Sequence, residues 1–213
     1  YSGSNKINEF TIWTINKENK IWKIIRVNVI IFGPPGAGKG TQALNIVKKF
    51  KLYQISTGDL LRNEVKNQTI IGKDIENIIS KGDFATDEIV NELIKNAIFD
   101  PQNKNKLIFD GYPRSLSQAK NLDSLLKKSN QKIDFIFFLN VNKKTIIDRI
   151  EKRKALEKRT DDNLTTILKR YDTYMETTKP VLDFYSKKSN FHEIDGDDKI
   201  EEISSKIEQI LSL

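Results

Sequence analysis

The stretch Gly33-Pro-Pro-Gly-Ala-Gly-Lys-Gly-Thr41 decides how the rest of the sequence is interpreted. It directly follows residues 27–32, Val-Asn-Val-Ile-Ile-Phe, a short and mostly apolar run of the kind that forms a buried parallel strand. A helix is expected to begin at Lys39 and to end at about Phe50. The sequence therefore predicts a glycine-rich turn that joins a buried strand to the N-terminus of a helix.

This turn has the pattern Gly-x-x-x-x-Gly-Lys of loops that bind nucleotide phosphates. Such a loop turns several backbone N–H groups toward one anion, which requires conformations that residues with a Cβ resist. The helix start adds a positive dipole, and Lys39 can reach the outer phosphates. The alternative is a glycine-rich turn without function, which four glycines in eight residues make a poor explanation. The pattern predicts ATP or GTP binding, but many reactions use this loop.

Apolar runs and helical periods alternate along the rest of the chain. Strands are expected at 52–55, 107–109 and 135–139 and near 191–194, and helices from 56 onward, at 75–79, 89–98, 143–157, 161–187 and 198–211. Strands that alternate with helices specify an α/β fold with a mainly parallel sheet.

The composition excludes several classes of protein. There is no cysteine and only one histidine, so disulfides, thiolate zinc sites and histidine-rich metal sites are excluded. No apolar run is long enough to span a membrane. The net charge is +7, with lysines dispersed among acidic residues, which favours a solvated basic surface over a nucleic-acid site. A reducing, cytoplasmic location is the simplest expectation.

Residues 1–26 differ from the remainder. They contain both tryptophans, and residues 10–15 alternate loosely, as a strand would, ahead of a turn at 17–20. The chain does not begin with methionine, as expected for a fragment, a processed product or an upstream-extended translation. We treat residues 1–26 as an extension and assign it no role.

The loop, with Gly40 inserted between the lysine and Thr41, resembles that of adenylate kinases and related nucleoside monophosphate kinases. Further family motifs follow in order: Ile55-Ser-Thr-Gly-Asp-Leu-Leu-Arg62, Gly82-Asp-Phe-Ala-Thr-Asp-Glu-Ile-Val90, Phe109-Asp-Gly-Tyr-Pro-Arg-Ser-Leu-Ser-Gln118, Asp148-Arg-Ile-Glu-Lys-Arg153, and Arg159-Thr-Asp-Asp-Asn163 with Arg170 beyond. The resemblance covers roughly residues 27–212. It implies a P-loop α/β fold with a five-stranded, mainly parallel sheet flanked by helices, a helical monophosphate-binding insert and a short lid.

The resemblance implies reversible phosphoryl transfer from Mg·ATP to AMP, which gives two ADP. This chemistry needs alignment and positive charge around the transferred group, and the planar fork of arginine binds phosphate oxygens in two places. A single arginine chosen at random is more often part of a surface ion pair. Six cations at six family positions favour catalysis, and these are Lys39, Arg62, Arg114, Arg153, Arg159 and Arg170.

Two nucleotide subsites are also implied by the resemblance. ATP is expected to contact Gly36, Ala37, Gly38, Lys39, Gly40, Thr41, Arg149, Arg153 and Asp198. AMP is expected to contact Thr57, Arg62, Asp83, Phe84, Ala85, Gly111, Tyr112, Pro113, Arg114, Gln118, Arg159 and Arg170. Thr57 and Gln118 match the family pattern for adenine, which favours AMP over UMP or CMP. The alternative for Gln118 is an exposed helix residue.

Asp110 ends an apolar strand beside the loop, where a carboxylate commonly orients Mg²⁺ and its waters. With Thr41 it is expected to hold Mg²⁺ through water, and a helix-capping or turn role is the alternative. No zinc is expected.

The lid is the short form, because only Lys-Ala-Leu-Glu-Lys separates Arg153 from Arg159. Short-lid members usually carry glycine here, and this sequence has none, so residues 143–158 could run as one nearly unbroken helix. Asp161 and Asp162 are expected either to cap the next helix or to close the lid through hydrogen bonds. Lid closure is expected to exclude water and to protect ATP from hydrolysis.

The expected organisation is an extension at 1–26 and a kinase domain at 27–213, divided into a core (27–55, 86–152 and 160–213), a monophosphate-binding insert (56–85) and a lid (153–159). The expected partners are ATP and AMP, with no nucleic acid and no membrane, and a monomer is expected. Three alternatives stay open: a UMP/CMP kinase, a GTP:AMP phosphotransferase and a non-catalytic P-loop nucleotide-binding module. The complete set of cations argues against the last.

Overall fold

The computed structural model describes residues 11–15, 21–80, 85–157 and 164–212, with the backbone alone at 11–15, 21–24, 77, 79, 80, 153–157 and 164. The strands are β1 (Thr11–Ile15), β2 (Ile21–Ile25), β3 (Val29–Phe32), β4 (Tyr53–Ser56), β5 (Leu107–Asp110), β6 (Phe135–Asn140) and β7 (Phe191–Asp195). The helices are α1 (Lys39–Phe50), α2 (Thr57–Lys66), α3 (Ile70–Ser80), α4 (Asp87–Phe99), α5 (Leu116–Lys128), α6 (Lys143–Glu157), α7 (Leu164–Thr173), α8 (Lys179–Tyr185) and α9 (Ile200–Leu211), with a 3-10 turn η1 (Pro101–Asn103) and a π-helical turn η2 (Tyr174–Thr178).

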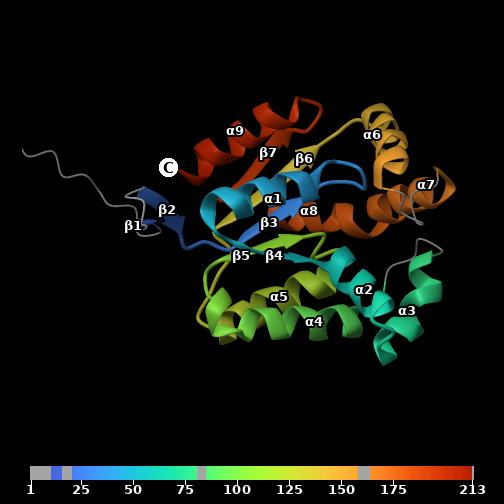
Figure 1. Ribbon diagram of the computed structural model, residues 1–213, viewed down its shortest axis with the longest axis horizontal. Helices are drawn as coiled ribbons and strands as arrows, with labels where there is room; N and C mark the ends of the chain where they lie inside the picture. Colours follow the sequence, from blue (N-terminus) through green and yellow to red (C-terminus); the bar gives the residue numbers. More distant parts are fainter. Residues whose placement is uncertain (1–10, 16–20, 81–84, 158–163, 213) are drawn as a thin grey trace, which may run out of the picture.

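Five of the described strands form one parallel sheet in the order β4-β5-β3-β6-β7. Figure 1 shows α1 and α9 on one side of this sheet and α4 and α5 on the other. β3 lies in the centre, and the chain first builds β4 and β5 on one side before it crosses to β6 on the other. Ligands of open α/β sheets bind at such a switch point, outside the carboxyl ends of the strands. The fold thus confirms the α/β expectation and directs attention to the loop after β3.

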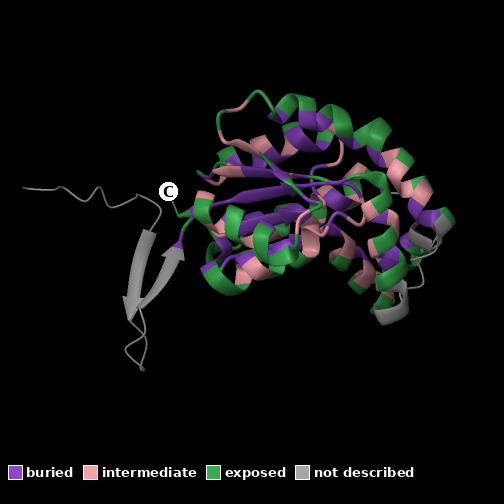
Figure 2. Ribbon diagram, turned by 90° about the horizontal axis from the view of Figure 1, so that it is seen from above, coloured by how far each residue is buried: buried purple, intermediate pink, exposed green. Residues whose placement is uncertain are grey.

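The core lies on both faces of the sheet, because successive side chains of a strand point to opposite sides. Val29 and Ile31 pack with α1 and α9, whereas Ile30 and Phe32 pack with α4, α5 and α8. All four residues of β3 are therefore buried. Figure 2 shows the same arrangement: the central strands are buried, and the helices are buried where they face the sheet. A run of apolar residues without alternation is what a strand covered on both faces requires.

Two elements differ from the pattern expected from the sequence. The helix expected at 161–187 is present as α7, η2 and α8, which follow one another without a break from Leu164 to Tyr185, but the π-helical turn within it was not expected. Residues 161–163 lie outside the described range. The range of helix α5 was not predicted, although Ser115 caps it by accepting a hydrogen bond from the N–H of Gln118. The lone strand expected at 10–15 is β1, which pairs antiparallel with β2 in a separate two-stranded sheet. None of the helices in the described ranges is long and apolar enough to cross a membrane.

A fully buried asparagine ties the amino ends of the central strands together. The amide nitrogen of Asn28 donates to the carbonyl oxygen of Lys132 (2.9 Å) and to Oε1 of Gln131 (3.2 Å). Its amide oxygen accepts from the backbone N–H of Leu107 at 3.1 Å. These bonds connect β3 to the start of β5 and to the segment before β6. Buried polar groups are stable only when they are paired in this way.

We predict that Asn28→Ala lowers the free energy of unfolding by roughly 2–4 kcal/mol, because each buried group left without its partner costs about 1–3 kcal/mol. Urea unfolding of the nucleotide-free protein measures this change. Asn45→Ala is the matched control, because its amide donates to Ser204 Oγ (2.9 Å) at a partly exposed position. The control should lose less than about 1 kcal/mol. Equal losses in the two variants would contradict the role given to Asn28.

Candidate active site

The loop between β3 and α1 has the backbone shape of a phosphate-binding loop. Gly36 and Gly38 have φ angles of 81° and 90°, in the left-handed region that favours glycine. A Cβ at Gly36 would also approach Cδ1 of Ile150 to 2.8 Å. Gly38 is the N-cap of α1, so the helix begins at Lys39. The loop therefore ends at a helix N-terminus, whose free N–H groups and dipole favour an anion.

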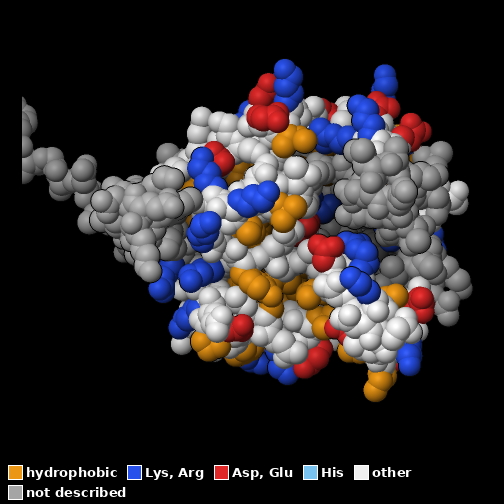
Figure 3. All heavy atoms as spheres, in the orientation of Figure 1, with side chains coloured by type: hydrophobic (Ala, Val, Ile, Leu, Met, Phe, Trp, Pro, Cys, Tyr) orange, Lys and Arg blue, Asp and Glu red, His pale blue; other side chains and the backbone are white. Residues whose placement is uncertain are grey.

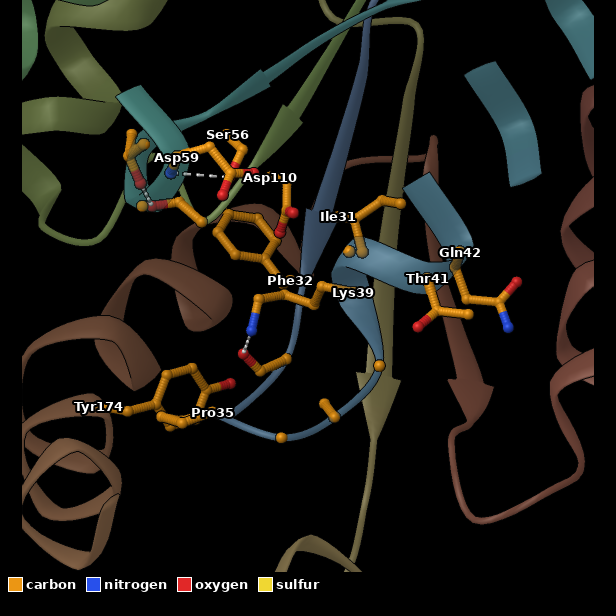
Figure 4. A pocket seen from close by; sticks show the side chains of 18 of the residues that line it. Ile31, Phe32, Pro35, Lys39, Thr41, Gln42, Ser56, Asp59, Asp110 and Tyr174 are labelled. Atoms are coloured by element: carbon orange, nitrogen blue, oxygen red, sulfur yellow. Dashed lines mark hydrogen bonds between the residues drawn. The ribbon is translucent and has the colours of Figure 1, made fainter. Parts of the chain in front are cut away.

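Lys39 places its positive charge over this loop. Its ammonium group donates to the carbonyl oxygens of Gly33 (2.8 Å) and Pro34 (3.0 Å). Figure 4 shows this side chain between the loop and the carboxylate of Asp110. The lysine expected to reach the outer phosphates is thus held at the mouth of the loop.

Asp110, the last residue of β5, is a buried carboxylate beside the start of α1. Its side chain accepts a hydrogen bond from Gln54 Nε2 at 3.1 Å, and a Cβ added to Gly40 would lie 3.5 Å from its Oδ2. Burial raises the pKa of Asp110 above its ordinary value, although the charges of Lys39 and Arg114 and the bond from Gln54 act in the opposite direction. Burial therefore outweighs the neighbouring positive charges in setting the pKa of Asp110.

Three arginines approach one another across the same cavity. The pKa of Arg114 is lowered to about 10, first by burial and then by the positive charges of Arg170 and Arg62. Nε of Arg114 donates to the carbonyl oxygen of Gly111 (2.8 Å), and Arg62 pairs with Asp59 at 2.5 Å. Like charges brought this close favour an anion between them. The arrangement suits an oligophosphate.

A network of hydrogen bonds forms the side of the cavity opposite the loop. Thr57 Oγ1 donates to the carbonyl oxygen of Gly111 at 3.0 Å. Gln118 accepts from the backbone N–H of Arg114 (2.7 Å) and donates to Asp87 Oδ1 (2.7 Å). Gln118 is 5% exposed, so the interpretation as an exposed helix residue is wrong. The two residues expected to read adenine therefore lie in a preformed polar wall.

Arg149 lies on the other side of the loop, on α6. Its guanidinium donates to the carbonyl oxygens of Ala37 (3.3 Å) and Asp198 (3.4 Å). It therefore joins the phosphate loop to the segment before α9. This is where a donor base is expected from the sequence.

A cavity of about 640 Å³ brings most of the expected residues together. Ligand pockets in proteins commonly measure about 300–1,000 Å³. On the face seen in Figure 3 the molecule is hollowed, with Lys and Arg side chains at the edge of the hollow. The expected residues that line the cavity are Gly36, Ala37, Gly38, Lys39, Gly40, Thr41, Thr57, Arg62, Ala85, Asp110, Gly111, Pro113, Arg114, Gln118, Arg149 and Arg170.

Some expected residues are not brought to this cavity or cannot be placed. Tyr112 lies in the core, where its hydroxyl donates to Asn91 Oδ1 (2.8 Å), and Asp198 does not line the cavity but accepts from Arg149. Asp83, Phe84, Arg159, Asp161 and Asp162, and the side chain of Arg153, lie outside the described residues. Their expected roles remain predictions.

The cavity also contains polar residues that the sequence did not single out. Gln54 holds Asp110, Asp59 pairs with Arg62, and Tyr174 lines the wall after Arg170. Gln54 and Asp110 come from neighbouring strands, β4 and β5, that pair in parallel. No local pattern marks Gln54, because its partner is 56 positions away in the sequence, whereas Asp59 and Arg62 are only three positions apart on α2.

The protein has a phosphate loop with its lysine at the switch point of the sheet, and guanidinium groups line the same cavity. These features define the class of P-loop nucleotide-binding proteins. The family model described as adenylate kinase matches residues 31–190. The chain is 48% identical to the adenylate kinase of Pelagibacter ubique, over 88% of this chain and all of that protein. It is 44% identical to that of Azobacteroides pseudotrichonymphae (85% and 95%) and 39% identical to that of Fusobacterium nucleatum (88% and 100%). The chain therefore belongs to the adenylate kinase family.

We predict that Asp110→Asn stabilises the nucleotide-free protein while it lowers phosphoryl transfer. A pKa above the ordinary value means that the folded state disfavours the charged carboxylate at neutral pH, and asparagine removes that charge. The stability contributed by the protonated form is lost as pH rises through the folded-state pKa, so the midpoint of thermal unfolding should rise most at neutral pH and least well below the ordinary pKa of 3.8. Thermal unfolding at both pH values, with ADP formation as the second measurement, tests this. Asp134→Asn, outside the cavity, should leave turnover unchanged. A fall in the midpoint for Asp110→Asn would overturn the interpretation.

Proposed function

We propose that the protein transfers the terminal phosphoryl group of Mg·ATP to AMP and releases two ADP. The observation that carries the proposal is one cavity lined by the phosphate loop with Lys39 on one side, by Thr57 and Gln118 on the other, and by arginines between them. A phosphate oxygen of AMP attacks the γ-phosphorus of ATP, and the β-phosphate leaves on ADP. This reaction asks the protein for in-line positioning and for positive charge around the transferred oxygens.

The residues divide naturally between the two nucleotides. The loop and Lys39 hold the ATP phosphates, with Arg149 beside the donor base. Arg62, Arg114 and Arg170 hold the phosphate of AMP and the oxygens of the transferred group. Arginine suits this task because its fork is preorganised and stays protonated. Even at a pKa of about 10, Arg114 keeps its charge at neutral pH.

Asp110 and Thr41 fit a Mg²⁺ ion that arrives with ATP. Mg²⁺ prefers oxygen ligands and usually keeps several waters, so it needs only one or two protein groups beside the phosphates. Both residues line the cavity next to the loop, and the raised pKa of Asp110 indicates a carboxylate that a further cation would stabilise. When bound, Mg²⁺ neutralises charge on the phosphates. Zinc is not expected, because the chain contains no cysteine.

The lid at 153–159 and the residues Asp161 and Asp162 complete the proposal. α6 runs without interruption to Glu157, as the glycine-free sequence indicated. We propose that Arg153 and Arg159 are carried toward the phosphates when the lid closes, and that closure excludes water from the transferred group. The insert at 56–85 contains α2 and α3 and carries Arg62 and Thr57. A monomer in the cytoplasm, with neither nucleic acid nor membrane as a partner, is the expected state.

We predict that Arg114→Ala lowers the rate of ADP formation from ATP and AMP by about 10³-fold or more, because a guanidinium that stabilises transferring phosphate contributes this much in related reactions. A coupled assay measures the rate. Arg26→Ala removes an exposed arginine outside the cavity and should leave turnover unchanged. A decrease of less than tenfold in the rate of ADP formation for Arg114→Ala would contradict a catalytic role for this residue. Nucleotide binding without any ADP formation by the unaltered protein would favour the non-catalytic module instead.

We predict that Thr57→Ala raises the KM for AMP about tenfold, since one hydrogen bond contributes roughly 0.5–1.5 kcal/mol, and leaves the KM for ATP unchanged. The hydroxyl lies on the AMP side of the cavity and is held by the carbonyl of Gly111. Assays with AMP, UMP, CMP and GMP as acceptors, and with ATP and GTP as donors, measure selectivity. Thr173→Ala, which loses only a bond within its own helix, is the control. UMP or CMP as the best acceptor of the unaltered protein would favour the pyrimidine alternative.

A further inference from the structure

Two buried tyrosine hydroxyls lack a hydrogen-bond partner within the part of the chain that the structure describes. They belong to Tyr174 and Tyr185. A buried hydroxyl without a partner lowers stability, so each such group in a native protein requires an explanation. The two residues have the same chemistry but different surroundings.

Tyr185 is explained by the core alone. It is fully buried on α8, where its ring packs against Phe32 with 5.5 Å between centroids and against Phe184 with 5.1 Å. The ammonium of Lys188 lies 4.6 Å from the centre of the ring. Tyr185 does not line the cavity. The ring of Tyr185 therefore contributes to core packing. A ligand in the cavity would not reach its hydroxyl.

Tyr174 instead lines the nucleotide cavity, although only 7% of its surface is exposed. It is the first residue of the π-helical turn η2, four positions after Arg170. Residues four apart share one side of a helix, so Tyr174 lies on the side that brings Arg170 to the cavity. Figure 4 shows its side chain directed toward the loop that carries Pro35 and Lys39. π-helical turns are rare and occur frequently at functional sites.

The surroundings of Tyr174 indicate which kind of ligand it would bind. Burial raises the pKa of its hydroxyl well above the ordinary value, so the group stays protonated and can donate a hydrogen bond. The phosphate loop and the guanidinium groups of Arg114 and Arg170 line the same cavity as Tyr174, and both kinds of group select anionic oxygens. A hydrogen-bond donor directed toward the phosphate loop is therefore better placed for a phosphate oxygen than for a base.

We propose that Tyr174 is a further phosphate-binding residue, whose hydroxyl donates a hydrogen bond to a phosphate oxygen of the bound nucleotides, directly or through one water. The inference rests on the proposed function, since it requires nucleotides in this cavity. It explains why a hydroxyl is present at a buried position that phenylalanine would fill equally well. The unpaired hydroxyl destabilises the nucleotide-free protein and is satisfied only in the complex, which favours binding of phosphates.

The test compares Tyr174→Phe and Tyr185→Phe in the full chain. Each variant removes one buried, unpartnered hydroxyl and keeps the ring, so both should fold with an unchanged or raised midpoint of thermal unfolding. Titration calorimetry then measures the affinity for a bisubstrate dinucleoside pentaphosphate and for inorganic tripolyphosphate. We expect Tyr174→Phe to weaken both affinities about tenfold, as the loss of one hydrogen bond to a charged group would. Tyr185→Phe should change neither.

Three outcomes would overturn the proposal. Unchanged affinities in Tyr174→Phe would show that the hydroxyl binds nothing in the complex. Equal losses in the two variants would assign the effect to packing. A loss for the dinucleotide without a loss for tripolyphosphate would place the contact on a base. ADP formation by the unaltered protein is measured beside these titrations, so failure of the proposed function appears there separately.

Discussion

The crowding of several positively charged side chains in one cavity is the constraint on which the rest of the structure depends. Lys39 and several arginines line the same space, and the pKa of Arg114 is lowered because burial and its neighbours oppose its charge. Hydrogen bonds to backbone carbonyl oxygens partly stabilise these positive charges: Lys39 donates to the loop, and Arg114 donates to Gly111. Entering phosphates relieve the repulsion. The repulsion between these groups destabilises the nucleotide-free protein, and its removal contributes to the free energy of nucleotide binding.

The parallel sheet is what brings these charges together. In a parallel sheet the carboxyl ends of the strands meet at one edge, so the loop after β3, Asp110 at the end of β5 and Thr57 after β4 become neighbours. The register fixes their alignment, because Asp110 pairs with both Ile31 and Ser56. Asn28 secures the opposite end of the same strands. Precision at the cavity thus depends on hydrogen bonds far from it.

The sequence predicted what depends on local pattern. α1 and α6 begin and end where their spacing indicated, and the cations of the family motifs that the structure describes line one cavity. It did not predict contacts between distant segments, such as the bond from Gln54 to Asp110 or the orphaned hydroxyl of Tyr174. The π-helical turn η2 was missed for the same reason, because residues 174–178 have the composition of an ordinary helix. Tertiary packing, not local propensity, sets such details.

The polar wall opposite the loop connects Thr57 and Gln118, the residues expected to contact the acceptor base, to Arg114. The carbonyl of Gly111 accepts from both Thr57 and Arg114, and the amide of Gln118 accepts from the backbone of Arg114 while it donates to Asp87. A base bound as proposed would contact Thr57 and Gln118, whose hydrogen bonds share partners with Arg114. Since the position of a guanidinium within an ångström governs its effect on phosphoryl transfer, a poorly fitting base would misplace that charge as well as bind weakly. Selectivity for the acceptor would then be expressed in turnover as much as in affinity.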